Sequence, residues 1–303
     1  MTQISCNCCQ HGMNNIGSFR DYLHYKCNNC GYEHFKNENV TISQDYEIDA
    51  DYLDDLNLFP DAGDRMQWHH HRAIDFIGRH SGAGAATLDV GCFDGFFVRQ
   101  LLDRGYDAHG LDFNRTAIAR GQDRFGLAGR ISNRTMTDLA AGGAQFDVIT
   151  MFEVIEHLDE FTPILEDCVR LLKPDGLLVI STPNSQMSWR PPLDFPPHHL
   201  SRFTPLSLRK MAGSLGLTPV SSAEQSSLFD FIRNYIGSLF RRKETASMRG
   251  GEFRHRATVD RLRRIANRLR GIAYRVLQPV DALLHRAGFR YIGQLMIARK
   301  PGR

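Results

Sequence analysis

Residues 85–97 read AATLDVGCFDGFF, a short apolar strand that breaks into a turn containing Gly91 and Gly95. The residues that follow, VRQLLDRG, are helix-like. A strand, a glycine turn and a helix in this order are typical of a nucleotide-binding site in an α/β protein. The glycines would let the backbone approach a ligand closely, and the amides of the turn and of the helix N-terminus offer hydrogen-bond donors. This stretch therefore predicts where a nucleotide-containing ligand binds.

Further strands and helices alternate beyond this turn. The predicted strands are DAHGLDF at 107–113, a third near Ile131, FDVITMF at 146–152 and GLLVIST at 176–182. Helices are predicted over 65–80, 115–124 and 164–172, and Lys-Pro-Asp-Gly at 173–176 would stop the last of them. This alternation predicts a Rossmann-like, doubly wound, mostly parallel α/β sheet. Its ligand site would lie at the carboxyl ends of the strands.

Five of the seven cysteines lie before residue 31. Cys6 and Cys9 form one C-x2-C pair, Cys27 and Cys30 form a second, and seventeen residues separate the pairs. This spacing predicts a tetrahedral four-cysteine zinc site, and the two-residue spacing favours Cys6 with Cys9 over the intervening Cys8. Because four thiolates leave no open coordination position, the zinc would serve folding or docking rather than catalysis.

The size and composition of the chain limit what it can be. With 303 residues, 42% of them hydrophobic, it can form one large α/β core and a small appended module. It contains no apolar run of about 18 residues, and its first residues are polar and cysteine-rich rather than basic and then apolar. We therefore expect a cytoplasmic protein in a reducing compartment, with peripheral attachment to a membrane as a further option.

Two cofactors suit the glycine turn. An acidic residue such as Asp112 at the end of the second strand also fits a dinucleotide site, where it would hold the adenosine ribose of NAD. The dinucleotide fingerprint G-x-G-x-x-G is incomplete, however, because its middle and third glycines are replaced by Phe93 and Phe96. Phe93 would crowd a pyrophosphate, so an NAD-dependent oxidoreductase is the alternative and not the preferred interpretation.

Five segments, LDVGCFDGFF, GLDFN, FDVITMFEVIEHL, LKPDGLLVISTPN and PPHHLSRFT, resemble successive motifs of class I S-adenosylmethionine-dependent methyltransferases. The resemblance extends over roughly residues 66–220, and EVIEHL is its most specific part. The chain resembles the branch that contains ubiquinone-pathway O-methyltransferases and many bacterial sugar and natural-product methyltransferases, and some enzymes of that broad group carry N-terminal zinc-binding cysteines. The resemblance implies methyl transfer to a small-molecule acceptor, as O-methylation of a sugar, polyketide or lipid-like biosynthetic intermediate.

The resemblance also implies which residues bind the cofactor. Asp89, Gly91 and Gly95 would line the methionine end of S-adenosylmethionine, and Asp112 would bind the ribose hydroxyls. The other implied positions are Cys92 in the turn, Phe113 after the second strand, Thr135 and Met136 near adenine, and Phe152 and Glu153 beside the sulfonium. Phe93 departs from the family pattern, which more often has glycine there, and this departure puts the shape of the turn in question.

A hydroxyl acceptor needs a base as well as an aligned methyl donor. Imidazole titrates near neutrality, so the candidates are His157 in the EVIEHL motif and His198 and His199 in the Pro-rich loop at 182–203. This loop follows the fifth strand at the cofactor end, which favours His199 or His198. The structural alternatives are a histidine that ties down the loop, and a His157 that holds the segment after the fourth strand.

A divalent metal is a further hypothesis. The resemblance to quinone O-methyltransferases permits Glu153, Glu156 and His157 to hold Mg²⁺ or Mn²⁺, although their spacing alone is not diagnostic. A metal site at the three consecutive histidines 69–71 is disfavoured, because consecutive residues of a helix point in different directions.

The C-terminal third contains a helix-like stretch at 206–215 and two strand-like stretches, LTPVSSAEQ at 217–225 and RYIGQLMIARK at 290–300. Methyltransferases of this class need little more than that last strand, so residues 228–288 are interpreted as an insertion. Its apolar residues recur at helical spacing, and residues 240–275 hold twelve Lys and Arg against three Asp and Glu. It would form a lid, a homodimer contact or, through residues 228–276, an element on an anionic membrane surface.

Two other functional classes remain as alternatives. Basic residues and a zinc knuckle would suit an RNA-modifying or nucleic-acid-binding protein, but the knuckles lie in acidic surroundings. A scaffold with a degenerate cofactor fold is disfavoured by the glycine turn, Asp112 and EVIEHL. The predicted division of the chain is a zinc-ribbon-like module at 1–40, a connector at 41–64, a methyltransferase core at 65–227 and 289–303, and the helical insertion at 228–288.

Overall fold

The structure is a computed structural model that describes residues 4–37, 65–191, 194–225, 228–229, 231–232 and 276–302. The predicted connector at 41–64 lies outside the described residues, as does most of the predicted insertion. The basic stretch through 228–276, for which membrane association is predicted, is therefore largely outside them too.

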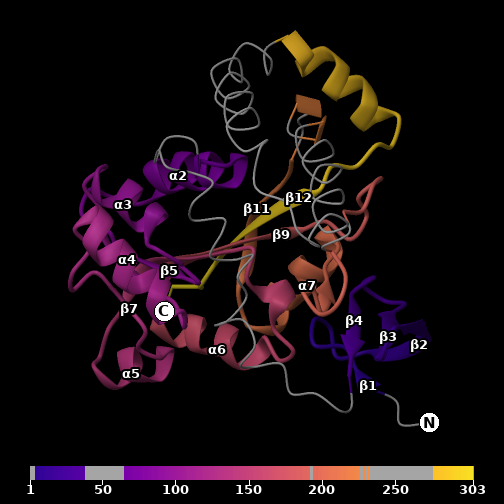
Figure 1. Cartoon of the computed structure of the whole chain (residues 1–303), viewed down its shortest axis with the longest axis horizontal. Helices are drawn as coiled ribbons and strands as arrows, with labels where there is room; N and C mark the ends of the chain where they lie inside the picture. The colour runs from indigo at the N-terminus through magenta and orange to yellow at the C-terminus, as the bar shows by residue number, and fades with distance from the viewer. Residues whose placement is uncertain are drawn as a thin grey trace, which may run out of the picture.

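The core is a seven-stranded sheet with the strand order β11-β12-β9-β8-β5-β6-β7 (Figure 1). Strands β9, β8, β5, β6 and β7 run parallel, whereas β12 is antiparallel to both β9 and β11. The strands are β5 (Ala86–Val90), β6 (Asp107–Leu111), β7 (Ile131–Ser132), β8 (Phe146–Phe152), β9 (Leu172–Pro183), β11 (Thr218–Glu224) and β12 (Gly293–Arg299). This order confirms the predicted Rossmann-like, mostly parallel α/β fold.

Helices cover both faces of the sheet. They are α2 (Trp68–His80), α3 (Phe96–Leu102), α4 (Arg115–Phe125), α5 (Met136–Ala141), α6 (Thr162–Leu171) and α7 (Pro205–Ser214). Side chains of α2, α3 and α4 belong to one buried cluster, and those of α5, α6 and α7 belong to another. Neighbouring strand residues alternate between them, since Val148 and Val179 join the first cluster and Ile149 and Ile180 the second. Strands that are apolar on both faces are what a helix-covered parallel sheet requires.

The predicted helix end before residues 173–176 is correct to within one residue, but the strand predicted at 176–182 begins earlier. Helix α6 ends at Leu171 and β9 already begins at Leu172, so the strand runs through Lys-Pro-Asp-Gly. The reason is long-range pairing with the end of the chain: the Asp175 amide donates to the Lys300 carbonyl at 3.0 Å, and the Lys300 amide donates to the Gly176 carbonyl at 2.9 Å. The helix predicted from residue 65 likewise begins later, at Trp68.

Helix α5 has no counterpart among the predicted elements. It holds six residues and begins with a capping box, in which Thr135 accepts from the Asp138 amide and the Asp138 carboxylate accepts from the Thr135 amide. Such reciprocal caps supply partners for the amides at a helix start and stabilise a short helix. Thr135, predicted near adenine, therefore also begins this helix.

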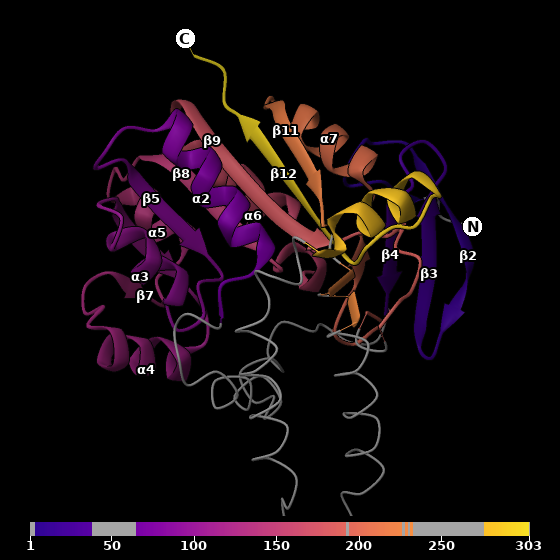
Figure 2. The same cartoon turned by 90° about the horizontal axis from the view of Figure 1, so that it is seen from above.

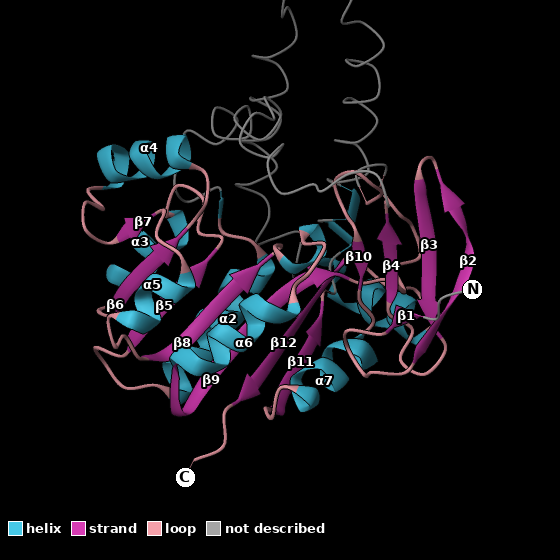
Figure 3. Cartoon of the chain, turned by 90° about the horizontal axis from the view of Figure 1, so that it is seen from below, coloured by secondary structure: helices cyan, strands magenta, loops and turns pink. Residues whose placement is uncertain are grey.

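The N-terminal cysteine module is a second sheet with the order β1-β2-β3-β4-β10. Its strands are β1 (Ile4–Ser5), β2 (Gly12–Phe19), β3 (Tyr22–Cys27), β4 (Glu33–Lys36) and β10 (Ser201–Arg202). Strand β10 comes from the loop after β9 and pairs with β4, with Ser201 opposite His34 and Arg202 opposite Glu33 (Figure 3). The module is thus joined to the core by main-chain pairing.

The module also packs on the core through buried side chains. Tyr32 is 1% exposed, and its ring contacts Phe161 at 5.8 Å and Phe203 at 5.2 Å between centroids. Its hydroxyl lies 2.7 Å from the Ser201 hydroxyl. The module and α4 lie at opposite ends of the molecule (Figure 2).

Part of the predicted helical insertion is described. Residues 276–286 are helical, and Val276, Val280 and Leu283 are exposed on this helix. Among the described helices, none has the length and apolar character to cross a membrane.

Candidate functional site

The turn between β5 and α3 has a backbone that requires its glycines. Gly91 and Gly95 have φ of +76° and +72°, a region that side-chain-bearing residues rarely adopt. A Cβ on Gly91 would collide with Val154, and one on Gly95 would lie 2.5 Å from Leu127 Cδ1. Phe93 adopts φ +53° without being glycine, so the departure from the family pattern keeps the left-handed conformation at this position.

Asp112 ties this turn to the end of β6. One carboxylate oxygen accepts from the Phe93 amide at 2.7 Å, and the other accepts from the Asn114 amide at 2.8 Å. Burial raises the pKa of Asp112 above its ordinary value. Each carboxylate oxygen keeps a second lone pair that can accept from a sugar hydroxyl. Phe113, the next residue, is 58% exposed.

Asp89 lies on β5, between β6 and β8. The Thr150 hydroxyl donates to one carboxylate oxygen of Asp89 at 2.6 Å. Burial raises the pKa of Asp89 to about 7. A cationic group beside it, such as the ammonium of an amino acid, would favour its ionised form.

Arg65 and Asp94 complete the turn and were not predicted. The Arg65 guanidinium donates to both Asp94 carboxylate oxygens, at 2.7 and 2.8 Å, and lies over the Phe96 ring at 4.7 Å. On the other side α4 packs so closely that a Cβ on Gly121 would collide with the Asp94 carbonyl. No spacing rule connects Arg65 to a residue 29 positions away, so the sequence held no signal for this pair.

Three predicted cofactor residues have side chains with structural roles. The Cys92 thiol is buried in a core cluster, where a Cβ on Gly110 would lie 2.7 Å from the sulfur. Met136 is buried in the other core cluster, and Thr135 caps α5. Cys92 can therefore serve a ligand only through its backbone.

Phe152, at the end of β8, packs among aromatic rings of α2 and α3. The His69 ring stacks on it at 5.0 Å between centroids, and the Phe97 ring meets it edge-on at 5.0 Å. Burial lowers the pKa of His69 to about 3, so this imidazole is neutral at physiological pH. The histidine run of α2 thus contributes neutral rings beside the end of β8.

Glu153 turns the chain sharply after β8. Its φ is +55°, its amide donates to the Ser181 carbonyl at 3.0 Å, and its carboxylate accepts from the Ser181 hydroxyl at 2.8 Å. Burial raises the pKa of Glu153. Glu153 is thereby held against β9, next to the turn that carries Glu156 and His157.

His157 and His199 come together from different segments. Their ring centroids lie 4.7 Å apart with planes at 83°. His157 Nδ1 lies 2.7 Å from the His198 carbonyl, so it carries a proton and Nε2 keeps the lone pair. Burial, followed by the nearby His199, lowers the pKa of His157 to about 3. His157 is therefore a neutral imidazole, better suited to bind a metal than to take up a proton at neutral pH.

A buried acid lies beside these two rings. Glu156 is 1% exposed, and neither of its carboxylate oxygens has a hydrogen-bond partner within the described part of the chain. Burial and the nearby Glu153 raise its pKa well above the ordinary value. Ligand atoms of Glu156, His157 and His199 all lie within 4.8 Å of one another. This group differs from the predicted set of Glu153, Glu156 and His157, because His199 takes the place of Glu153.

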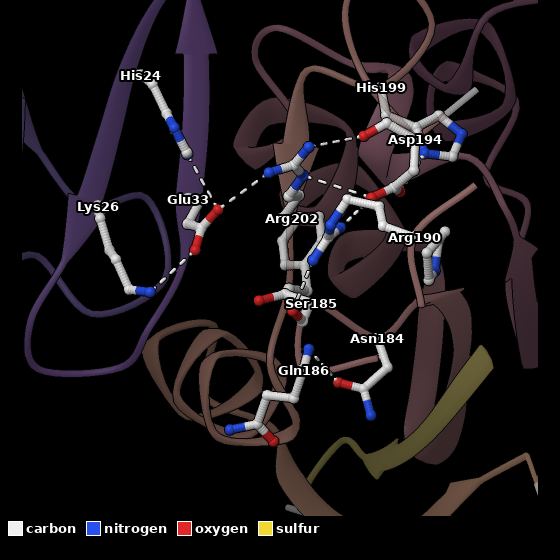
Figure 4. A network of polar contacts seen from close by, with 12 residues as sticks. His24, Lys26, Glu33, Asn184, Ser185, Gln186, Arg190, Asp194, His199 and Arg202 are labelled. Carbon is white, nitrogen blue, oxygen red and sulfur yellow. Dashed lines mark hydrogen bonds and ion pairs between the residues drawn. The ribbon is translucent and has the colours of Figure 1, made fainter. Parts of the chain in front are cut away.

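His199 is held by Asp194 in the Pro-rich loop, as Figure 4 shows. His199 Nδ1 lies 2.8 Å from an Asp194 carboxylate oxygen. Asp194 also pairs with Arg190 and with Arg202. Although burial would raise the pKa of Asp194, the hydrogen bond from His199 and the two arginines keep it below its usual range. Asp194 was not predicted; the one signal in the sequence was an acid five residues before a candidate histidine.

The four predicted cysteines meet at one point of the N-terminal module. The Cys6 and Cys30 sulfurs lie 3.5 Å apart, those of Cys9 and Cys27 lie 3.6 Å apart, and all four lie within 4.8 Å. A tetrahedral zinc ion with bonds of about 2.3 Å would separate its sulfurs by roughly 3.8 Å. The four sulfurs therefore fit a zinc ion, and Cys8 lies outside the group.

Comparison with known proteins shows that this chain is similar to methyltransferases. The family described as Methyltransferase domain matches residues 65–222. A probable S-adenosylmethionine-dependent methyltransferase of Mycolicibacterium smegmatis is 29% identical over 160 residues, 52% of this chain and 62% of that protein. A ubiquinone biosynthesis O-methyltransferase of Cereibacter sphaeroides is 34% identical over 155 residues, 45% of this chain and 62% of that protein. The match thus spans somewhat under two thirds of the length of these curated relatives.

Among solved structures, the (4+2)-cyclase SpnF has a TM-score of 0.56 at 18% sequence identity, and the match covers 86% of this chain and 96% of that one. At this identity the likeness concerns the fold alone.

Proposed function

The chain belongs to the Methyltransferase domain family, and we propose that it transfers a methyl group from S-adenosylmethionine to a small-molecule acceptor. The observation that carries this proposal is the turn at 91–95, whose glycines are required by its backbone and which Asp112 ties to the end of β6. This turn and its acid lie where a Rossmann-like sheet binds its nucleotide.

The residues at this edge would share the binding of the cofactor. Asp112 would accept from the ribose hydroxyls, and Asp89 would face the ammonium of the methionine part. Gly91, Gly95 and the Cys92 backbone would form the surface of the turn, and Phe113 would offer its exposed ring. Phe152 and Glu153 would border the sulfonium, with Thr135 and Met136 toward adenine. Bound S-adenosylmethionine supplies a methyl carbon that its sulfonium makes electrophilic.

We assign the role of base to His199 and the acceptor atom to a hydroxyl oxygen. Asp194 holds His199 Nδ1 at 2.8 Å, which leaves Nε2 to take up the hydroxyl proton. The acceptor oxygen would then form its bond to the methyl carbon as the bond from carbon to sulfur breaks, leaving S-adenosylhomocysteine. The acceptor would be a sugar, polyketide or lipid-like intermediate, as the family resemblance implies.

The histidine pair provides a test of this role. His199→Gln should lower the rate of methyl transfer by about 10²- to 10⁴-fold, because a general base contributes about that much. Affinity for S-adenosylhomocysteine should stay unchanged. His198→Gln in the same loop is the matched control, and a larger loss there would assign the base to His198 instead.

A second proposed role of Glu156, His157 and His199 is to bind a divalent cation. The buried, unpartnered Glu156 oxygens and two imidazoles would suit Mn²⁺ or Fe²⁺ better than Mg²⁺. His199 cannot hold a cation and act as the base through the same nitrogen. Titration of the zinc-loaded protein with Mn²⁺, followed by electron paramagnetic resonance, separates the two roles. A tight site that Glu156→Gln abolishes supports the cation, and the absence of a tight site removes it.

The four cysteines are proposed to hold a structural zinc ion. We also propose that the chain divides into the module at 1–40, the connector at 41–64, the core at 65–227 and 289–303, and the insertion at 228–288, which would act as a lid, a homodimer contact or a membrane-surface element. In the cytoplasm, the insertion would attach the protein to the membrane surface. We do not expect the protein to bind nucleic acid.

Calorimetric titration with S-adenosylhomocysteine, run beside NAD, tests the cofactor. Binding of the former alone supports the proposal, whereas binding of NAD alone overturns it. Because a (4+2)-cyclase shares this fold, cofactor binding alone does not establish methyl transfer. Methyl-labelled S-adenosylmethionine should therefore be incubated with panels of hydroxylated sugars, polyketides and lipid-like compounds, and label should appear in at least one of these acceptors.

A further inference from the structure

The residue that follows His199 is held from two sides. The Leu200 amide donates to the Glu156 carbonyl at 2.8 Å, and the Leu200 carbonyl accepts from the Phe35 amide of the N-terminal module at 2.8 Å. Leu200 is thereby fixed between the turn that carries His157 and strand β4 of the module. The position of the His199 backbone thus depends on β4.

Arg202 makes a second connection between the module and His199 (Figure 4). One guanidinium nitrogen donates to the Asp194 carbonyl at 2.9 Å, and Nε lies 3.4 Å from an Asp194 carboxylate oxygen. The remaining nitrogen lies 3.4 Å from the Glu33 carboxylate on β4. Asp194 in turn holds His199 through its other carboxylate oxygen. Glu33, Arg202, Asp194 and His199 therefore form a continuous chain of contacts.

The guanidinium of Arg202 is closely packed. Its side chain is 7% exposed, and it lies 4.6 Å from the ring centroids of both Phe35 and Phe195. Phe195 stacks in addition on Phe19 of β2 at 4.9 Å. A planar guanidinium between two rings has little room to rotate, so it transmits the position of the module to the loop.

Charge balance also connects the two parts. Glu33 is paired with His24 and Lys26 at 3.0 Å each, within the module. Asp194 is paired with Arg190 and His199 within the loop. Arg202 lies between these two acids, so removing its charge would take away the one cation that they share and leave each carboxylate with partners from its own part only.

From these contacts we infer that the N-terminal zinc module holds the loop of the acceptor site in place, and that Arg202 positions Asp194 and His199 through its contact with Glu33 of the module. The inference rests on the proposed function for its catalytic meaning. The cofactor turn is held by Asp112 and Arg65 instead. Loss of zinc or of Arg202 should therefore disturb the acceptor side of the site and spare the cofactor side.

Hydrogen exchange measured by mass spectrometry on the full chain tests this inference without any acceptor. Arg202→Gln and zinc-stripped wild type should each exchange amides in 194–203 at least about tenfold faster. The residues 88–97 should exchange unchanged, and the affinity for S-adenosylhomocysteine should stay within about twofold. Arg130→Gln is the matched control, since Arg130 pairs with Asp107 at the surface of the nucleotide-binding sheet. Unchanged exchange of 194–203 in both samples would overturn the inference.

Two further variants keep the test decisive. If Arg202→Gln fails to fold, Glu33→Gln interrupts the same chain of contacts at its module end and should give the same local effect. Once an acceptor is known, Arg202→Gln should lower kcat with little change in the KM for S-adenosylmethionine, and Arg202→Lys should restore part of it. A failure of wild type to bind S-adenosylhomocysteine would contradict the proposed function while leaving the exchange result interpretable.

Discussion

Asp112 connects two parts of the candidate cofactor site, because its carboxylate accepts from the amides of both Phe93 and Asn114. Phe93 lies in the turn after β5, and Asn114 follows β6. The side chain proposed to bind the ribose therefore also shapes the backbone around it.

Asp112→Ala should weaken the binding of S-adenosylhomocysteine by on the order of 10- to 100-fold, because charge-assisted hydrogen bonds to the ribose are lost. It should also lower the free energy of unfolding by about 1–3 kcal/mol, since two amides lose their acceptor. Calorimetry and urea titration measure the two effects. Asp107→Ala, at the exposed start of the same strand, is the control, and an equal loss of affinity there would argue against the ribose role.

Glu33 gives a prediction for stability against pH. Although burial would raise its pKa, hydrogen bonds from His24 and Lys26 lower it from 4.5 to about 2. A lowered pKa means that the stabilisation is present above about pH 4.5 and is lost as the pH falls toward 2. Glu33→Gln should therefore cost about 1–3 kcal/mol at pH 7, and the difference from wild type should shrink below pH 4. Thermal unfolding at several pH values measures this, and a constant difference down to pH 3 would contradict it.

The sequence marked Asp112 correctly as an acid at a strand end, but not as the residue that shapes the turn. Arg65 and Arg202 were not predicted, because Asp94 and Glu33, with which they pair, lie 29 and 169 positions away. Periodicity and spacing describe local neighbours, whereas these contacts exist only once the chain is folded.

Strands and helices were predicted best where one face or both faces of an element are apolar, as in β5, β8 and α4. Prediction failed for α5, which depends on its cap, and for β10, whose two residues carry no pattern of their own. It also missed the start of β9 at residues 172–175, where Pro and Gly favour a turn but pairing with Lys300 extends the strand. In each case a specific hydrogen bond overrides local preference.

The turn between β5 and α3 can be tested with a pair of glycines. Gly91→Ala should lower the free energy of unfolding by about 2–4 kcal/mol and weaken S-adenosylhomocysteine binding, because the new Cβ meets Val154 as well as an unfavourable φ. Gly105 has φ +82° with nothing within 4 Å of its would-be Cβ. Gly105→Ala should therefore cost only about 1–2 kcal/mol and leave affinity intact. Equal effects of the two substitutions would show that Val154 does not crowd the turn.

The described part of the chain consists of a seven-stranded sheet and a cysteine module that share one buried cluster of side chains. Cys6, Cys27, Cys30 and Tyr32 belong to the same buried cluster as Leu208 of α7. The sequence predicted the sheet and the module but not that they share a core, because this depends on β10 and on buried contacts between distant segments. The comparisons cover the sheet, since the family match begins at residue 65.

Cys27→Ser and Cys30→Ser should each release the zinc and lower Tm by about 5–10 °C, since a loss of roughly 2–3 kcal/mol shifts a domain of this size by that much. Elemental analysis measures the metal, and calorimetry measures Tm. Cys168→Ala, in α6, should keep the full metal content, as should Cys8→Ser. A full zinc complement in Cys27→Ser would refute the four-cysteine site.

The pairing of β4 with β10 has a consequence for synthesis of the chain. The four cysteines are present once the first 30 residues have left the ribosome, but the strand that completes their sheet is made only at residues 201–202. Until then β4 presents an unpaired edge, which is a site for wrong association. Capture of the proposed zinc ion and closure of the sheet would thus be separated by the time needed to synthesise most of the seven-stranded core, and the edge of β4 would need protection throughout this interval.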